Sequence, residues 1–485
     1  MTLKLDDPEL LREANLIGGE WIGADSGETI DVTNPATGDV IGTVPKCGAA
    51  ETKRAIDAAE KAMKEWAKEL PETRARVLRR LFDLMGEHRD DLCRIMTAEQ
   101  GKPLKESGSE TDYAAGFIEW FSEEARRIYG DVIPRNSDGR RLLAIKQPVG
   151  VVAAITPWNF PSAMITRKAG PAWAVGCGVV VKPATATPFS ALALGVLAER
   201  AGLPAGLCNI VTGSASDIGG EMTGNPTVRK ISFTGSTEVG AKLYSDAAHT
   251  IKKVSLELGG NAPLLVFDDA DLDAAVEGVM QAKFRNGGQA CTAANRIFVQ
   301  SGVYEEFADK LASKIRGLTV GNGMEDGVDV GPLIDPDAVD KVEEHIADAK
   351  EHGGRVVVGG ERHEKGGTFF QPTLMVDVDH HAKVTHEETF GPFAPLFRFE
   401  TEEEGLRLAN DTRFGLASYF YARDIGRIFR IAEGLEAGMV GVNEGLISTP
   451  MAPFGGVKAS GIGREGSKYG ADEYLEIKYI ALGGL

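Results

Sequence analysis

In the middle of the chain, short apolar runs alternate with stretches that have helical spacing. Four runs are typical of strands buried on both faces: VGVVAAI at 149–155, GVVVK at 178–182, CNIV at 208–211 and ISF at 231–233. Helix-like residues fill the intervals, for example 189–202. Strands separated by helices of about 10–15 residues are joined by right-handed crossovers, so this region predicts a parallel sheet of the kind that binds nucleotides.

The same reasoning predicts elements on either side of this region. Residues 16–45 combine short apolar pieces with turn signals, which indicates short strands. Apolar residues at helical spacing predict helices over 56–70 and 71–85, and a third helix is expected over Leu104–Ile128. Towards the C-terminus, the predicted strands are 264–267, 296–299 and 356–358, and the predicted helices lie near 270–285, 303–315, 338–352, 403–411 and 423–436.

Residues 131–148 differ from both flanking regions. Asn136–Gly139 has the sequence of a hairpin turn between two extended pieces. A hairpin between helical regions predicts an arm that packs on its own domain or reaches another subunit.

Composition and charge narrow the possible functions. A chain of 485 residues is too long for one ordinary core, so two or three domains are expected. The net charge of −18 argues against nucleic acid or an anionic membrane as the main partner. The five cysteines lack the spacing of a disulfide framework or a zinc site, and the N-terminus lacks the apolar core of a signal peptide. We therefore expect a reduced, cytoplasmic protein without a metal site.

One stretch, from Gln281 to Arg296, has the composition of a loop that presents a thiol. Gly287 and Gly288 allow a tight turn just before Cys291, and small residues follow the cysteine. The alternative is a buried cysteine after the end of a helix, because a free cysteine usually packs as a small apolar residue.

Two glycine-rich stretches are candidates for phosphate binding. The GxGxxG match at 461–466 does not follow a buried strand, which the dinucleotide fingerprint requires, so we interpret it as a chance match. FTGSTEVG at 233–240 follows a predicted strand and opens a predicted helix, so its amides and the helix dipole can bind pyrophosphate.

The chain resembles the aldehyde dehydrogenase superfamily in seven motifs that occur in order. They are ITPWNFP (155–161), KPA (182–184), FTGSTEVG (233–240), LELGG (256–260), GQAC (288–291), EETFGP (387–392) and PFGG (453–456). Within the superfamily, NFPSAMITRK, KFRNGGQAC, APFGGVKASG and GREGSKYG resemble the succinate-semialdehyde dehydrogenase branch.

The resemblance implies a set of catalytic residues. Cys291 attacks the aldehyde as a thiolate, and the amide of Asn159 and the backbone N–H of Cys291 stabilise the oxyanion. Glu257 activates the water that hydrolyses the thioester, and burial would raise its pKa towards a useful range. Lys168 lies near the catalytic centre. The structural alternatives are a turn residue at Asn159, a salt-bridged carboxylate at Glu257 and a solvated lysine at Lys168.

The resemblance also implies the cofactor site. Lys182 contacts the adenosine ribose, Gly235 and Ser236 the pyrophosphate, and Glu388 and Phe390 the nicotinamide end. The segment Thr156–Pro157–Trp158 lies along the cofactor.

The position of Thr185 bears on the choice of cofactor. NAD-selective relatives often carry a glutamate there, which bonds the ribose hydroxyls, whereas a small hydroxyl accommodates a 2′-phosphate beside Lys182. We therefore expect NADP to be preferred, with NAD use possible.

Three residues implied by the branch concern the substrate. Arg167, Arg285 and Ser448 would grip the distal carboxylate of succinic semialdehyde, since paired guanidinium groups bind carboxylates through parallel hydrogen bonds. The alternative is that both arginines are ordinary surface or helix-capping residues. Glutarate semialdehyde or another ω-carboxylated aldehyde remains open, because the loop 449–451 departs from the more polar sequence expected. An uncharged or cationic aldehyde is a further alternative, against which the two arginines argue. A catalytically idle binding module of the same fold is a further alternative.

A second departure concerns redox control. The branch often carries a second cysteine two residues after the nucleophile, where this chain has Ala293. A disulfide switch between those two positions is therefore impossible.

The expected fold is α/β and similar to that of aldehyde dehydrogenases. We expect a Rossmann-type cofactor domain formed by 1–130 and 149–258, and an α/β catalytic domain at 259–470. The β oligomerisation arm would comprise 131–148 and 471–485 and would pair across subunits, giving a homo-oligomer, either a dimer or a tetramer.

Overall fold

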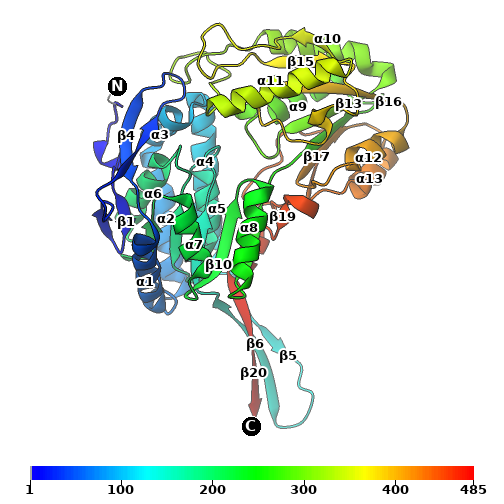
Figure 1. The fold of residues 1–485 in the computed structure, drawn as a ribbon. Helices are drawn as coiled ribbons and strands as arrows, with labels where there is room; N and C mark the ends of the chain where they lie inside the picture. Colours follow the sequence, from blue (N-terminus) through cyan, green and yellow to red (C-terminus); the bar gives the residue numbers. More distant parts are fainter. Residues whose placement is uncertain (1–2, 485) are drawn as a thin grey trace.

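The computed structural model describes residues 3–484 and contains two large sheets (Figure 1). The first sheet has eight strands, in the order β19-β11-β10-β7-β8-β9-β1-β2. The five strands from β11 to β9 are parallel, as predicted. Their bounds, in chain order, are β7 Val151–Ile155, β8 Val179–Lys182, β9 Cys208–Ile210, β10 Val228–Thr234 and β11 Lys253–Glu257. The outer strands are β1 Asn15–Ile17, β2 Glu20–Ile22 and β19 Gly461–Ile462.

Helices cover both faces of this sheet, because its strands are apolar on both sides. Val152 and Ala154 belong to one core cluster and Val151 and Ala153 to another. The helices are α1 Ala49–Trp66, α2 Pro71–Glu87, α3 Arg89–Gln100, α4 Leu104–Glu124, α5 Ala163–Val175, α6 Phe189–Arg200, α7 Ala215–Gly224 and α8 Thr237–Ala248. The predicted third helix ends at Glu124 rather than Ile128, and α3 was not predicted.

The second sheet has seven strands, in the order β14-β15-β16-β13-β12-β17-β18. Its strands are β12 Ala262–Val266, β13 Ala294–Gln300, β14 Arg355–Val358, β15 Thr373–Val376, β16 Phe393–Phe399, β17 Ala417–Tyr421 and β18 Met439–Val442. Its helices are α9 Leu272–Phe284, α10 Tyr304–Arg316, α11 Pro336–Glu351, α12 Glu402–Asn410 and α13 Ile425–Gly434. The sequence predicted these helices and strands β12 to β14, but not β15 to β18.

A small three-stranded sheet extends away from both larger ones (Figure 1). It consists of β5 Asp131–Ile133, β6 Arg140–Pro148 and β20 Leu475–Gly483, with β6 in the middle. The predicted hairpin turn at 136–139 is confirmed, since β5 and β6 pair in antiparallel fashion on either side of it.

Shorter elements complete the fold. A separate hairpin pairs β3 Thr29–Thr33 with β4 Val40–Pro45, and α14 spans Ser467–Asp472. The 3₁₀ helices are η1 Pro8–Leu10, η2 Arg285–Gly288, η3 Ser301–Val303, η4 Lys383–Thr385 and η5 Lys458–Ser460. Within residues 3–484, no helix combines the length and apolarity needed to cross a membrane.

We expected residues 461–470 in the catalytic domain, but strand β19 at Gly461–Ile462 belongs to the first sheet. Strand β19 pairs antiparallel with β11, so that Gly461 lies opposite Glu257. The C-terminal part of the chain thus returns to the carboxyl end of β11. This return places residues near position 465 beside residues near 257.

Candidate active site

The loop that carries Cys291 has an unusual backbone. Asn286, Gly287 and Gly288 have φ angles of 52°, 60° and 77°, all in the left-handed region. A Cβ atom at Gly288 would overlap the carbonyl oxygen of Gly391, so the close approach of these two backbones requires glycine. The chain therefore leaves α9 through three left-handed residues and reaches Cys291 in a fixed position.

The environment of the Cys291 sulfur differs from that of the other cysteines. Cys291 is partly exposed, whereas the other four cysteines are buried. Protein atoms packed around the sulfur raise the pKa of the thiol to about 12, and the positive charge of Arg167 opposes that shift. The thiol is therefore protonated at rest, and its attack on a substrate requires the proton to leave.

Asn159 is fixed against the Cys291 loop. Its Nδ2 donates to the carbonyl of Gln289 at 3.0 Å, and its own carbonyl accepts from Lys102 Nζ at 2.7 Å and from Asn286 Nδ2 at 3.1 Å. The side chain reaches across to the loop instead of satisfying its own backbone, as a turn residue would. The amide can still donate its second N–H, which is what stabilisation of an oxyanion needs.

Glu257 ends β11 and is a buried carboxylate. It is 2% exposed, and neither carboxylate oxygen has a hydrogen-bond partner in the part of the chain that the structure describes. Burial and then the charge of Glu465 raise its pKa well above the usual value, against the opposing influence of Arg167 and Lys168. Glu257 therefore forms no salt bridge within residues 3–484, and the structural alternative of a salt-bridged carboxylate is wrong. A buried carboxylate with a raised pKa has the properties of a general base.

Glu465 forms ion pairs with two adjacent cations in the first half of α5. Its carboxylate forms ion pairs with Arg167 and Lys168, and all three side chains are buried. Lys168 Nζ also donates to Thr234 Oγ1 at 2.7 Å, while burial lowers its pKa. Lys168 is therefore not a solvated lysine, and Arg167 is not a surface residue.

Glu465 was missed at the sequence level. It lies within the GxGxxG segment that we interpreted as a chance match. The context of that segment, an antiparallel edge strand, does rule out the dinucleotide fingerprint. The glycines of this segment are typical of phosphate binding, and no pattern in the sequence indicates a role for the glutamate between them.

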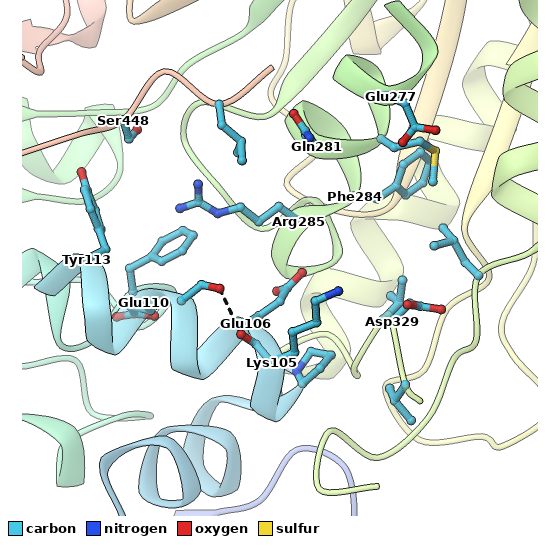
Figure 2. Close-up of a pocket in the computed structure, with 18 residues that line it drawn as sticks. Lys105, Glu106, Glu110, Tyr113, Glu277, Gln281, Phe284, Arg285, Asp329 and Ser448 are labelled. Carbon is cyan, nitrogen blue, oxygen red and sulfur yellow. Dashed lines mark hydrogen bonds between the residues drawn. The ribbon is translucent and has the colours of Figure 1, made fainter. Parts of the chain in front are cut away.

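A cavity of about 590 Å³ opens beside the Cys291 loop, between α4, α9 and the loop around residue 446 (Figure 2). Arg285 and Ser448 both line it. The guanidinium of Arg285 lies 4.7 Å from the centre of the Phe160 ring. Arg167 lies outside the lining and is packed 4.3 Å from the Phe454 ring.

The residues expected at the cofactor lie at the carboxyl ends of three parallel strands. The segment 156–158 follows β7, Lys182 ends β8 and Gly235 follows β10. Open parallel sheets bind ligands at this edge. Ser236 caps α8 by accepting from the N–H of Val239 at 3.3 Å, so the helix dipole and neighbouring amides face the expected pyrophosphate.

Several atoms at this edge fit a bound dinucleotide. Thr156 Oγ1 is buried without a hydrogen-bond partner among residues 3–484, and Lys182 Nζ donates to the carbonyl of Pro183 at 3.1 Å while keeping further N–H groups. Thr185 is exposed in the turn after β8. The donor set therefore suits ribose and phosphate oxygens.

The expected nicotinamide end lies nearer Cys291. Phe390 packs edge-on against Trp158 with ring centres 5.6 Å apart. Burial raises the pKa of Glu388 to about 8, and a Cβ atom at Gly259 would lie 3.0 Å from its carboxylate. A Cβ at Gly260 would overlap the carbonyl oxygen of Cys291. The LELGG glycines thus let the cysteine loop and Glu388 approach the same point.

This fold and the residues gathered at this site are those of a nucleotide-binding oxidoreductase, with Cys291 as its candidate nucleophile. The model of the aldehyde dehydrogenase family matches residues 21–480, and the chain belongs to that family.

Other members of the family match this chain over almost its whole length. It is 62% identical to the glutarate-semialdehyde dehydrogenase of Pseudomonas aeruginosa, with 100% of both chains covered. It is 63% identical to the NADP(+) succinate-semialdehyde dehydrogenase GabD of Escherichia coli K12, covering 99% of this chain and 100% of the relative. A crystal structure of an E. coli NADP-dependent enzyme superposes with a TM-score of 0.99 at 63% identity, covering 99% of this chain and 100% of that one.

Replacement of Glu257 by Gln tests the general base. The variant keeps the shape of the side chain but cannot take a proton from water, so we expect kcat to fall by about 100-fold or more. The first turnover should still release about one equivalent of reduced cofactor per site as a burst, since thioester formation precedes hydrolysis. Stopped-flow absorbance at 340 nm measures both phases.

The pH dependence provides a second readout of the same variant. Because only ionised Glu257 can accept a proton and its pKa is raised, wild-type kcat should increase with pH above the ordinary carboxyl range. The Gln variant should lose that increase. A variant without a burst, or with the wild-type pH profile, would contradict the role in hydrolysis.

Proposed function

We propose that this aldehyde dehydrogenase oxidises succinic semialdehyde to succinate. The observation that carries the proposal is the position of Arg285 and Ser448, which line one cavity beside the loop that presents Cys291. A four-carbon aldehyde with a terminal carboxylate places its anion a short chain away from its reactive carbon. The names of the two relatives, which act on the four-carbon and five-carbon semialdehydes, agree with this choice.

Arg167 would complete the anion site. Its Nη1 and Nη2 atoms are buried and, within residues 3–484, have no hydrogen-bond partner. Buried polar groups in folded proteins are nearly always hydrogen-bonded, so two free guanidinium nitrogens suit a ligand with oxygen acceptors. The pairing of Arg167 with Glu465 holds the guanidinium in place without occupying those two nitrogens.

Each candidate catalytic residue has a role in one step of the proposed reaction. The Cys291 sulfur attacks the aldehyde carbon, and Asn159 Nδ2 and the Cys291 N–H stabilise the oxygen of the thiohemiacetal. The bound nicotinamide cofactor supplies the hydride acceptor. Glu257 then removes a proton from the water that attacks the thioester, and the acid leaves with Cys291 restored. The chain holds all three groups, with Asn159 bonded to the Cys291 loop and the charge of Glu257 acting on the Cys291 thiol, which argues against an idle binding module.

Glutarate semialdehyde is the second candidate substrate. The cavity of about 590 Å³ is larger than a four-carbon chain requires, so one further methylene can be accommodated. The loop 449–451, which follows Ser448, would set how far the distal carboxylate lies from Cys291.

We propose NADP as the preferred cofactor, with NAD as a weaker alternative. Thr185 is exposed in the turn after β8, close in sequence to the buried Lys182. A hydroxyl and an ammonium group can both bond a 2′-phosphate, whereas a carboxylate at position 185 would repel it. The NADP(+) in the name of the E. coli relative agrees with this preference.

We also propose that the arm joins subunits into a dimer or tetramer, in the cytoplasm. Strand β20 lies at the edge of its sheet and carries Ile477 and Tyr479, which are 74% and 61% exposed. An edge strand with exposed apolar residues is a surface that pairs readily with a second chain. All five cysteines are free, which suits a reducing compartment.

Replacement of Arg285 by Ala tests the anion site. Loss of a charge-assisted hydrogen bond should raise KM for succinic semialdehyde by about 10–100-fold. KM for butanal, which has the same length and no carboxylate, should change little. Steady-state kinetics with both aldehydes measure the difference, and Arg229→Ala, at an exposed arginine of β10, is the matched control. Equal losses on both aldehydes would contradict the anion-binding role.

The cofactor preference is tested at position 185. Wild-type kcat/KM should be higher with NADP than with NAD, and Thr185→Glu should lower the NADP value by about 10-fold or more because the carboxylate repels the 2′-phosphate. Thr185→Ser keeps the hydroxyl and should keep the preference. A wild-type enzyme that prefers NAD would refute this assignment.

The arm is tested by light scattering after size exclusion. Ile477→Asp places a charge on the exposed apolar face of β20 and should lower the measured mass towards that of a single 51.7 kDa chain. Lys478→Asp changes the neighbouring residue on the opposite face of the strand and should leave the mass unchanged. A wild-type protein that is monomeric would refute the role of the arm.

A further inference from the structure

Tyr113 lies in the same cavity as Arg285 and Ser448 but belongs to none of the motifs described above. It projects from α4, and Figure 2 shows all three side chains around the cavity. Its ring packs edge-on against Phe117, with ring centres 4.8 Å apart and an interplanar angle of 66°. The ring is therefore held by its own helix, and the hydroxyl has a fixed direction.

The hydroxyl of Tyr113 is an unsatisfied polar group. Its Oη atom is buried, and within residues 3–484 no well-formed hydrogen bond reaches it, although the Arg167 guanidinium lies close enough to oppose the rise in its pKa by hydrogen bonding and by charge. Arg167 can only donate, so the phenolic O–H is left without an acceptor. A buried hydroxyl without a partner is energetically unfavourable, so proteins seldom retain one unless a ligand or water completes the bond. Tyr113 Oη shares this condition with two guanidinium nitrogens of Arg167.

Two positive charges act on this hydroxyl. Burial raises the pKa of Tyr113, and the charges of Arg167 and Arg285 oppose that increase. The phenol therefore keeps its proton at neutral pH and can act as a donor. A neutral donor near two guanidinium groups complements a small oxyanion, because the arginines supply the charge and the phenol adds a directed hydrogen bond.

We propose that Tyr113 contacts the substrate and donates a hydrogen bond to the terminal carboxylate of the aldehyde. This inference rests on the proposed function and adds a residue to its anion site. A carboxylate has about four acceptor positions, so when each arginine and Ser448 contributes one hydrogen bond, a fourth position remains for a donor from the α4 side of the cavity. With α4 supplying Tyr113 and α9 leading to Arg285, the anion is held from two sides.

The variant Tyr113→Phe removes one oxygen atom and keeps the ring and its contact with Phe117. We expect kcat/KM for succinic semialdehyde to fall by about 10-fold or more, mainly through KM, as expected for loss of a hydrogen bond to a charged group. The value for butanal should change by less than about twofold, since that aldehyde offers no anion. Tyr244→Phe, at an exposed tyrosine of α8, is the matched control.

Inhibition by succinate gives a readout that does not depend on turnover of the aldehyde. Succinate carries the same terminal group, so its inhibition constant should increase in Tyr113→Phe by a factor similar to that of KM. A thermal unfolding midpoint equal to that of the wild type shows that the variant is folded. Removal of an unsatisfied hydroxyl gives no reason to expect destabilisation.

Two results would overturn the role of Tyr113: unchanged kinetics and succinate inhibition in Tyr113→Phe, or equal losses on succinic semialdehyde and butanal. These results are distinct from a failure of the proposed function. If the wild-type enzyme had the same kcat/KM for butanal as for succinic semialdehyde, the anion site as a whole would be refuted. If the wild type prefers succinic semialdehyde and Arg285→Ala abolishes that preference while Tyr113→Phe keeps it, only the inference about Tyr113 fails.

Discussion

The arrangement of the site depends on one buried ionic cluster. Two carboxylates, Glu257 and Glu465, and two cations, Arg167 and Lys168, lie in a region from which water is largely excluded. Burial penalises each charge, and the pairs of Glu465 with both cations offset much of that penalty. Glu257 belongs to neither ion pair, so burial and the nearby charge of Glu465 leave it with a raised pKa. The same cluster therefore fixes the Arg167 guanidinium, which we propose binds the substrate anion, and raises the pKa of Glu257, which we propose as the general base.

The cluster is assembled from distant parts of the chain. Arg167 and Lys168 are adjacent on α5, Glu257 ends β11, and Glu465 follows β19. Adjacent residues on a helix point in different directions, which is how Arg167 faces the cysteine loop while Lys168 reaches Thr234. The pairing of β19 with β11 brings the glutamate into range. A change in that short strand would therefore alter the chemistry of residues two hundred positions away.

The sequence predicted much of the fold because its signals were local. Strands β7 to β10 are continuous apolar runs between helices, and the hairpin at 136–139 has its own turn chemistry. Strands β15, β16 and β17 were missed because they are buried along almost their whole length, so their sequences show no alternation of apolar and polar residues. Strand β18 was missed because it has only four residues and includes Gly441, which weakens the strand signal. Helix α3 was missed because it follows α2 almost without a break, with only His88 between them. Family motifs predicted catalytic roles for Cys291, Asn159 and Glu257, whereas the interest of Glu465 and Tyr113 depends on contacts between elements that no local pattern encodes.

Ala293 has a consequence for the lifetime of the enzyme. It occupies the position where the related branch often has a second thiol, and the other four cysteines are buried away from solvent. Oxidation of Cys291 by peroxide gives a sulfenic acid, which is normally rescued when a neighbouring thiol condenses with it. Without such a neighbour, further oxidation to the sulfinic acid is irreversible for ordinary cellular thiols. Recovery of an oxidised Cys291 would then depend on free cellular thiols reaching its sulfenic acid before a second oxidation makes the damage irreversible.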